Sequence, residues 1–284
     1  MKKNLSVTII TLNEESNIER AIRSASFADE IIVVDSGSVD HTVLIATNLG
    51  AKVIPQKFLG FGQQKNYAAT FCRNEWILNI DADEEISEEL KNSILEHTTT
   101  SSSSSSPLLY KVNRLNFFCG KAITHGGWYP DMQVRLYHKN YCEWTTPHVH
   151  EELTTKKECS EQSLRTVGTL QGHLHHYTFK TLMQQVQTNI RYASLGAAEL
   201  LKRQNGRKLR FYSLLFRPFF KFIECYFIKL GFLDGRFGFI IAINAAYSMF
   251  LKYAFSYVDT EVSGIEIVTS RKLYGDQVND KVSN

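Results

Sequence analysis

Two carboxylates stand one residue apart where an apolar run of the chain ends. Residues 76–80 are predicted to form a buried strand, and Asp81-Ala82-Asp83 follows it directly. Because the chain turns at a strand end, both carboxylates can face one divalent cation, and hard oxygen ligands suit Mg²⁺ or Mn²⁺. The pair could equally cap the turn that follows. The next residue, Glu84, is expected at the surface or in that turn.

A third carboxylate ends another apolar run, at residues 30–35. Asp35 is followed by Ser36-Gly37-Ser38-Val39-Asp40, whose small side chains would let backbone and carboxylate approach a bound ring or ribose. The alternative is that Asp40 simply caps the following helix. Polar groups at two strand ends nevertheless favour a ligand site.

The elements that must hold these groups alternate between strand and helix patterns. Predicted strands cover residues 6–12, 30–35, 51–54 and 76–80, and predicted helices cover residues 18–25, 43–50, 63–72 and the segment that starts at 87. This alternation indicates βαβ units and therefore an α/β fold with a mostly parallel sheet. Ligands of such sheets bind at the carboxyl ends of the strands, where Asn13, Asp35 and Asp81 stand.

The rest of the chain changes character twice. A Thr/Ser tract at 98–106 is predicted to be a flexible surface loop, and β-rich patterns follow at 109–115, 133–138 and 166–175. From Thr178 onward the pattern is helical. We therefore expect a catalytic α/β domain over residues 1–177 with its loop at 98–107, a helical extension over 178–257, and a polar tail over 258–284.

Composition narrows the class of protein. The 284 residues are 43% hydrophobic and 21% charged, as in globular proteins with a true core, and a net charge of +3 argues against a nucleic-acid binder. Five cysteines without a CxxC pair fit free thiols in a reducing cytoplasm. The apolar run after Met1-Lys2-Lys3 is too short for a signal peptide, so we interpret it as a strand.

The positive charge is concentrated late in the chain. Residues 1–201 hold 19 basic and 22 acidic side chains, whereas residues 202–236 hold nine basic and two acidic ones among many aromatic residues. The uncharged stretch 237–251 is shorter than the roughly 20 residues of a membrane span. We therefore predict amphipathic helices that lie on an anionic membrane. The alternatives are helices packed on the catalytic domain and a re-entrant hairpin broken at 231–235.

In their order along the chain, these motifs resemble the family 2 glycosyltransferases, whose fold is the nucleotide-sugar-binding, Rossmann-like GT-A type. The resemblance covers roughly residues 5–255. It rests on Thr11-Leu12-Asn13-Glu14, Val33 to Asp40, Gly60-Phe61-Gly62-Gln63-Gln64-Lys65-Asn66-Tyr67-Ala68, Asp81-Ala82-Asp83 and Val149-His150-Glu151. Within that family, the segment from Gly60 to Ala68 and Val149-His150-Glu151 look most similar to bacterial lipopolysaccharide-core β-glucosyltransferases and their relatives.

The resemblance implies a role for each matching residue. Those that would bind the nucleotide sugar are Thr11, Asn13, Glu14, Asp35, Ser36, Lys65, Asp81 and Ala82. Asp83 would be the main metal ligand, with Asp81 holding the ribose or binding the metal through water. On charge alone, Lys65 could instead be a solvated surface lysine.

Inverting sugar transfer, which the resemblance implies, needs a base for the acceptor hydroxyl. We select Glu151 in Pro147-His148-Val149-His150-Glu151-Glu152, since the pKa of a carboxylate beside an anionic site is tuned by that environment. Glu152 is the rival, because adjacent residues of an extended segment face opposite ways. Both could also be surface carboxylates of a loop.

Seven of the nine histidines fall within residues 125–176. A zinc site would have to combine two separate clusters without a cysteine at finger spacing. We instead predict His175 or His176, with His175 preferred, as a late ligand of the metal or diphosphate. A packed or hydrogen-bonded histidine is an equal alternative for each.

The segment Gly126-Gly127-Trp128-Tyr129-Pro130-Asp131 resembles the acceptor side of the family. The face of Trp128 could stack on a sugar ring and Asp131 could accept its hydroxyls, although Trp128 could equally be a core residue. Arg135 is predicted to pair with Asp131 or with a phosphate of the acceptor.

The expected activity is metal-dependent, inverting transfer of a hexose from a nucleotide sugar, expected to be UDP-linked, to a lipid-linked saccharide such as lipopolysaccharide core. The protein is expected in the cytoplasm, peripherally bound to the inner face of the cell membrane. One alternative is a nucleotidyltransferase, although Asn13-Glu14-Glu15-Ser16 stands where its Gly-rich loop belongs. Another is a non-catalytic membrane-docking protein with a degenerate site.

Overall fold

The computed structural model describes residues 4–99, 107–145, 152–156, 167–204 and 210–261. The chain divides into two compact units. The sheet unit comprises Met1–Leu115 and Asp131–His176, and the helical unit comprises Asn116–Pro130 and Tyr177–Asn284. Each unit is described by itself below.

The elements have the following bounds. The strands are β1 Leu5–Thr11, β2 Glu30–Asp35, β3 Lys52–Pro55, β4 Trp76–Asp81, β5 Glu84–Ile86, β6 Leu109–Phe118, β7 Lys121–Ala122, β8 Asp131–His138, β9 Cys142–Trp144, β10 Leu153–Thr155 and β11 Val167–Phe179. The helices are α1 Ile18–Ser24, α2 Thr42–Asn48, α3 Phe61–Thr70, α4 Glu88–Thr99, α5 Leu182–Gln204, α6 Tyr212–Ile223 and α7 Gly235–Glu261. Two short pieces, η1 Glu224–Ile228 and η2 Gly231–Asp234, join α6 to α7.

The strands follow the order β3-β2-β1-β4-β8-β6-β11-β5, and β7 pairs with β6. β1 is parallel to both β2 and β4, and β2 is parallel to β3, whereas β8 joins β4 in the antiparallel direction. The predicted α/β fold is therefore confirmed, with parallel strands at its amino-terminal end and antiparallel pairing beyond β4.

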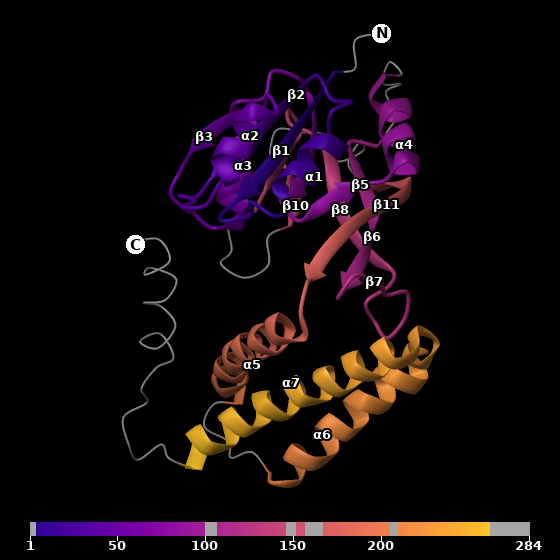
Figure 1. Ribbon diagram of the computed structural model, residues 1–284. Coiled ribbons are helices and arrows are strands. Elements are labelled where there is room, and N and C mark those ends of the chain that lie inside the picture. The colour runs from indigo at the N-terminus through magenta and orange to yellow at the C-terminus, as the bar shows by residue number, and fades with distance from the viewer. Residues whose placement is uncertain (1–3, 100–106, 146–151, 157–166, 205–209, 262–284) are drawn as a thin grey trace. The chain divides into compact units, whose positions relative to one another are not determined.

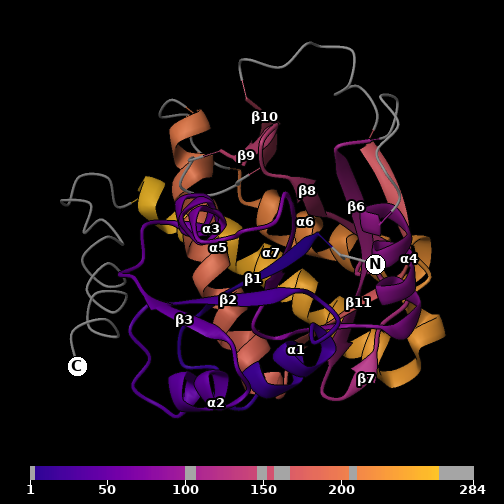
Figure 2. The ribbon, with the colours of Figure 1, turned by 90° about the horizontal axis from the view of Figure 1, so that it is seen from above.

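Both faces of the parallel strands are covered, which is why the sequence of β2 is apolar without interruption. Val33 packs into the core with Ala21 and Ala46 of α1 and α2, while Ile32 and Val34 pack into a second core with Ala68 of α3. Figure 2 shows α3 on one side of β1 to β3 and α1 and α2 on the other. Because successive side chains of β2 point to opposite faces of the sheet, each face of the strand is buried in its own core.

The helix predicted to begin after Ser87 is present as α4. The Ser87 hydroxyl accepts the N–H of Leu90 at 3.2 Å and the N–H of His173 at 3.1 Å, so one side chain caps the helix and docks β11 on its start. α4 extends through Thr98, which is buried. The predicted loop therefore begins later than expected, and residues 100–106 lie outside the described part of the chain.

In the helical unit, α7 packs along α5 and along α6 (Figure 1). The hairpin at 116–130 belongs to this unit because Phe118 and Ile123 share a small core with Ile241 of α7. The buried carboxylate of Asp234 strengthens the junction by accepting the N–H of His125 at 2.8 Å.

α7 is longer than the uncharged stretch predicted. Among the described residues, Gly231–Val258 is long and apolar enough to cross a membrane by length and composition, a criterion that core helices of soluble proteins also meet. Only 22% of its apolar window is buried. The whole helix thus meets a length criterion that the uncharged stretch 237–251 by itself does not.

Candidate functional site of a sugar-transferring enzyme

The polar strand ends predicted from the sequence lie side by side. In the sheet register Thr11 of β1 is opposite Asp35 of β2, and its neighbour Ile10 is opposite Asp81 of β4. Three strands thus deliver a hydroxyl and two carboxylates to one edge of the sheet unit. The Thr11 hydroxyl is buried and has no hydrogen-bond partner among the described residues. A buried hydroxyl left in this state costs about 1–3 kcal/mol, which a ligand that bonds to it would relieve.

Asp35 organises the loop after β2. Its carboxylate accepts the backbone N–H groups of Gly37 at 3.0 Å and Ser38 at 2.9 Å, and also the Ser38 hydroxyl. The Ser38 oxygen in turn accepts the N–H of Asn13 at 2.8 Å, and the Asn13 side-chain oxygen accepts the N–H of Val39 at 2.9 Å. Asn13 has a φ of +56°, a conformation that asparagine tolerates better than most residues. The loops after β1 and β2 therefore form one hydrogen-bonded unit.

Glu14 and Ser36 complete these two loops. The Glu14 N–H donates to the Thr42 hydroxyl at 2.7 Å, and its carboxylate accepts from the Asn17 amide at 2.6 Å. The Ser36 hydroxyl accepts from the buried amide of Gln64 at 3.2 Å. Gln64 therefore joins the start of α3 to the same loops.

A row of side chains with alternating charge lies next to Asp81, at the carboxyl end of β4. The guanidinium of buried Arg135 donates to Asp81 at 2.8 Å and to fully buried Glu84 at 2.6 Å. Arg114 lies 3.4 Å from Glu84 and 2.8 Å from Asp131. The five side chains thus run in the order Asp131, Arg114, Glu84, Arg135, Asp81.

These ion pairs contradict two predictions made from the sequence. Arg135 does not pair with Asp131 but binds Asp81 and Glu84, while Arg114, which was not among the predicted site residues, pairs with Asp131. Glu84 is not a surface or turn residue, because it is fully buried in β5 and accepts the N–H of Asp81 at 2.9 Å. The sequence Asp81-Ala82-Asp83-Glu84 does not reveal which of its three acidic side chains points into the interior.

The electrostatic environment favours ionised Asp81. Burial by itself would raise the pKa of Asp81, but the nearby Arg135 guanidinium and Lys65 ammonium outweigh it and hold the pKa below its ordinary value. For Glu84, burial and the neighbouring Asp81 charge raise the pKa despite Arg135. Asp81 is therefore the anion of this pair that faces the edge of the sheet.

The histidines of β11 are divided between the two faces of the sheet. His176 lies opposite Glu84 in the register, and its Nε2 is 3.3 Å from the Asp83 carboxylate. His175 lies opposite Glu85 and faces that residue at 4.0 Å. Of the two candidates, the structure thus places His176 beside Asp83, and the preference for His175 as metal-side ligand is corrected.

Lys65 joins α3 to the strand that precedes the Glu151 segment. Its side chain is buried, with the ammonium 4.2 Å from the ring centre of Trp144 in β9, so the solvated-surface alternative for this lysine is wrong. The neighbouring Asn66 donates to the Trp144 carbonyl at 2.8 Å and accepts its N–H at 2.9 Å. α3 therefore holds β9 through a cation–π contact and a reciprocal pair of hydrogen bonds.

Glu151 lies outside the described residues, as do both histidines before it. The two ends of its segment are described. The Thr145 N–H donates to the Glu152 carbonyl at 2.8 Å, and the Glu152 N–H donates to the Thr145 hydroxyl at 2.9 Å. Thr145 and Glu152, the described residues on either side of this segment, are therefore bonded to each other next to Trp144.

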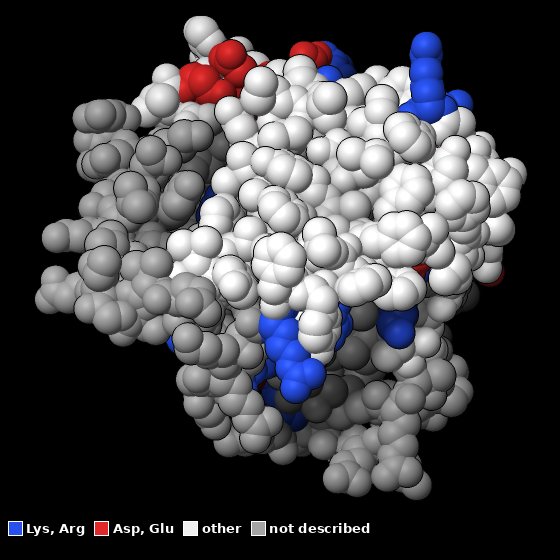
Figure 3. Space-filling model, turned by 90° about the horizontal axis from the view of Figure 1, so that it is seen from below, with Lys and Arg blue, Asp and Glu red and all other residues white. Residues whose placement is uncertain are grey.

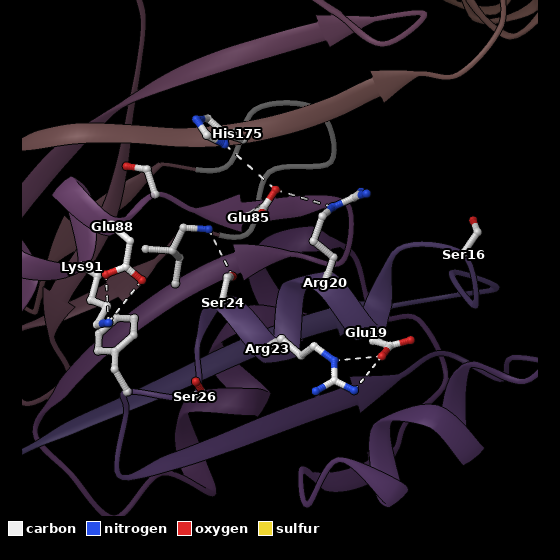
Figure 4. Close-up of a pocket in the computed structure, with 13 residues that line it drawn as sticks. Ser16, Glu19, Arg20, Arg23, Ser24, Ser26, Glu85, Glu88, Lys91 and His175 are labelled. Atoms are coloured by element: carbon white, nitrogen blue, oxygen red, sulfur yellow. Dashed lines mark hydrogen bonds and ion pairs between the residues drawn. The ribbon is translucent and has the colours of Figure 1, made fainter.

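A cavity of about 650 Å³ lies on the α1 side of β5 (Figure 4). Its charged lining is internally paired, since Glu85 lies between His175 and Arg20, Arg23 pairs with Glu19, and Lys91 pairs with Glu88. Burial lowers the pKa of His175 in spite of Glu85. Because successive strand residues face opposite ways, this cavity lies on the other face of β5 from Glu84.

The remaining predicted acceptor residue, Trp128, belongs to the helical unit. Its ring packs edge-on against Phe118 at 6.0 Å between centroids and against Phe179 at 6.1 Å. Within that unit these contacts favour the core interpretation of Trp128, which the sequence left open.

A family model described as "Glycosyl transferase family 2" matches residues 6–157, just over half of the chain. This part includes the site residues at the ends of β1, β2 and β4. The chain belongs to glycosyltransferase family 2. An uncharacterized glycosyltransferase of Rickettsia typhi is 35% identical over 256 residues, which cover 89% of this chain and 86% of that protein. The lipopolysaccharide core biosynthesis glycosyltransferase LpsC of Rhizobium meliloti is 29% identical, over 89% of this chain and 92% of its own.

Among solved structures, this glycosyltransferase is similar to the glucosyl-3-phosphoglycerate synthase of Mycobacterium tuberculosis in complex with Mn²⁺ and UDP. The identity is 27%, the similarity covers 40% of this chain and 43% of that one, and the TM-score is 0.33.

The metal donors of this glycosyltransferase are few. The described residues contain no group of three or more His, Cys, Asp or Glu side chains that could hold a metal by themselves. Asp83 and His176 offer one carboxylate and one imidazole, and Asp81 is held by Arg135. Such a set fits an Mg²⁺-like ion that takes its other ligands from substrate phosphates and water. It does not fit a closed structural metal site.

Proposed function

We propose that this glycosyltransferase moves a hexose from a UDP-linked sugar to a lipid-linked saccharide of the lipopolysaccharide-core type, with a divalent metal and with inversion. The observation that carries the proposal is the juxtaposition of Thr11, Asp35 and Asp81 at one sheet edge, with Asp83 in the turn before β5 and His176 beside it on β11. The similarity to LpsC, a lipopolysaccharide core biosynthesis glycosyltransferase, supports the proposed acceptor class.

The loops after β1 and β2 would bind the nucleoside. Asp35 already accepts three hydrogen bonds from its own loop, so its role is to fix the Ser36 to Ser38 backbone around a ribose or base. Asn13 and Glu14 would line the same pocket through the shared loop, and the unsatisfied Thr11 hydroxyl would bond to the ligand. Preformed loops of this kind reduce the entropy lost on binding.

Charges of both signs would hold the diphosphate. Lys65 supplies a buried ammonium near the Asp81 strand end, and Ala82, whose methyl group packs in the core, would meet the ligand only through its backbone. Asp83 and His176, with Asp81, would hold the metal. When bound, that metal would neutralise the negative charge that develops on the leaving diphosphate.

Glu151 would accept the proton of the attacking acceptor hydroxyl. The bond between that oxygen and the anomeric carbon forms while the bond to the diphosphate breaks, and the proton passes to the carboxylate. The closed Thr145–Glu152 junction and the Asn66 clamp on Trp144 would position this segment beside Lys65. The acceptor would bind at the cytoplasmic face of an anionic membrane. Asp131, which pairs with Arg114, would bind the hydroxyls of the acceptor.

The proposal is tested by comparing Glu151→Gln with the matched variant Glu152→Gln. We expect Glu151→Gln to lower transfer from UDP-glucose to lipopolysaccharide-core acceptors by about 10²–10⁴-fold, the usual contribution of a general base. UDP binding with Mn²⁺, measured by calorimetry, should stay unchanged. Glu152→Gln should keep both properties, and wild-type transfer by Glu151→Gln would contradict the assignment. Release of pyrophosphate from a nucleoside triphosphate would instead indicate a nucleotidyltransferase.

A second prediction concerns Asn66 as a positioning residue. Asn66→Ala removes both hydrogen bonds to Trp144, so the base segment is held less accurately, and a misplacement of about 1 Å costs about 10²-fold in rate. We expect kcat to fall about 10- to 100-fold while the KM for the donor changes little. Asn140→Ala, which removes one exposed contact with Glu75, is the control. An equal loss of kcat in both variants would contradict the role of Asn66.

A further inference from the structure

The helical unit exposes far more apolar surface than its fold requires. No residue of α6 is buried, and its large apolar side chains recur every three or four residues. Those that are exposed in α6 and the pieces after it are Phe211, Tyr212, Leu215, Phe216, Phe219, Phe220, Phe227, Ile228, Leu230, Phe232 and Leu233. Phe220 is 61% exposed and Ile228 is 71% exposed. Soluble proteins rarely leave such a contiguous surface uncovered unless it binds something.

Positive charges accompany this surface, which we name the α6 face. The segment 210–236 carries five basic side chains and two acidic ones, and Arg210 and Arg217 are exposed. Glu224 pairs with Lys221 at 3.0 Å and with Lys229, and Asp234 is buried against Thr124 and His125. Figure 3 shows a broad uncharged surface with charged side chains, both basic and acidic, at its margins. Aromatic residues beside basic ones suit a bilayer with anionic headgroups.

The packing of α7 excludes the simplest membrane arrangement for this unit. α5 lies along α7, with the Asn189 amide donating to the Asn244 carbonyl at 3.4 Å and the Ser256 hydroxyl reaching the Ala197 carbonyl at 3.4 Å. α5 also carries exposed charges, at Arg191, Glu199, Lys202 and Arg203. A helix with these charges is costly to place in hydrocarbon, so α7 cannot cross a bilayer while α5 stays packed on it.

We propose that the α6 face lies half-inserted in the interface of an anionic lipid bilayer, while α7 stays packed against α5 and α6 and spans nothing. The aromatic rings would lie at the headgroup–acyl boundary, and the exposed Arg210 and Arg217 would reach the lipid phosphates from beside them. The α6 face, and not the apolar helix α7, is therefore the membrane anchor. This inference stands independently of the sugar and acceptor proposed above, because it concerns the helical unit alone.

The first test is binding of the full chain to vesicles of phosphatidylcholine with and without 30% phosphatidylglycerol. We expect Phe219→Gln/Phe220→Gln to weaken binding to the anionic vesicles by about tenfold or more, since both positions lose the apolar area that they would bury in the interface. The control Tyr192→Gln/Leu195→Gln removes comparably exposed apolar side chains from α5 and should bind normally. Arg210→Gln/Arg217→Gln should remove the preference for anionic vesicles. UDP binding with Mn²⁺ should be the same in all variants.

The second test separates insertion of α6 from insertion of α7. Phe219→Trp should be quenched by dibrominated lipid beyond the wild-type background, whereas Leu195→Trp on α5 should not. The wild-type protein should leave membranes in alkaline carbonate. Retention in carbonate, or quenching at both positions, would overturn the proposal in favour of a span. Failure to bind anionic vesicles, together with a dimer that Phe219→Gln/Phe220→Gln dissociates, would overturn it in favour of a second copy of the chain.

Discussion

Asp83→Ala is expected to lower sugar transfer by about 10³-fold or more while the sheet unit stays folded. The Asp83 carboxylate is half-buried and contacts His176, so its removal leaves no buried charge without a partner. What is lost is the carboxylate through which a metal would be held, and metal stabilisation of a developing phosphate charge contributes several kcal/mol. Transfer at saturating UDP-sugar, followed over a Mn²⁺ titration, is the measurement.

The matched control is Glu85→Ala, two residues along the chain. Glu85 has the same chemistry and similar exposure but faces Arg20 and His175 on the opposite side of β5. It should transfer sugar at close to the wild-type rate. If both variants lost transfer equally, or if Asp83→Ala kept the wild-type response to Mn²⁺, Asp83 would not be the metal ligand.

Arg135→Met is expected to destabilise the sheet unit by about 3–5 kcal/mol. Arg135 is buried and neutralises two carboxylates, one of them the fully buried Glu84, so its removal leaves two acidic groups without their common partner. Denaturant unfolding followed by tryptophan fluorescence measures the loss, because Trp76 and Trp144 both lie in this unit. The variant Arg23→Met breaks an exposed pair with Glu19 and should cost less than about 1 kcal/mol.

A double variant distinguishes the mechanism from simple loss of packing. Glu84→Gln removes the charge that Arg135→Met strands, so the two substitutions together should cost less than the sum of their separate costs. Strict additivity would mean that Arg135 acts through its bulk and not through its charge. Because Arg135 also fixes Asp81, even a mild loss of stability should be accompanied by weaker UDP binding.

Most of the fold could be predicted because its signals are local. Apolar runs that end in Asp35 and Asp81 indicate buried parallel strands, and Ser87 before two glutamates indicates a helix start, as the structure has them. The order of the strand ends is enough to gather Thr11, Asp35 and Asp81, since parallel strands share one carboxyl edge.

The charged interior could not be predicted, because it depends on pairings between distant strands. Arg114 and Arg135 lie on β6 and β8, and nothing in their local sequence shows that one binds Asp131 and the other Asp81. Likewise, only the register of β11 against β5 decides which histidine lies near Asp83. The α6 face was visible as composition, but its exposure depends on how α5 and α7 pack.

One glycine decides how β11 meets the rest of the sheet unit. Gly172 has a φ of +88°, and a Cβ placed there would lie 2.3 Å from the backbone nitrogen of Leu90 at the start of α4. Any side chain at this position would thus push β11 away from the start of α4, where the Ser87 hydroxyl accepts the N–H of His173 in β11. Position 172 consequently admits a single amino acid, and a methyl group added there would misalign His176 four residues away without touching it. If a natural or engineered substitution at residue 172 abolished activity, the cause would be a misaligned β11. The side chains proposed to bind the metal would all still be present in such a variant.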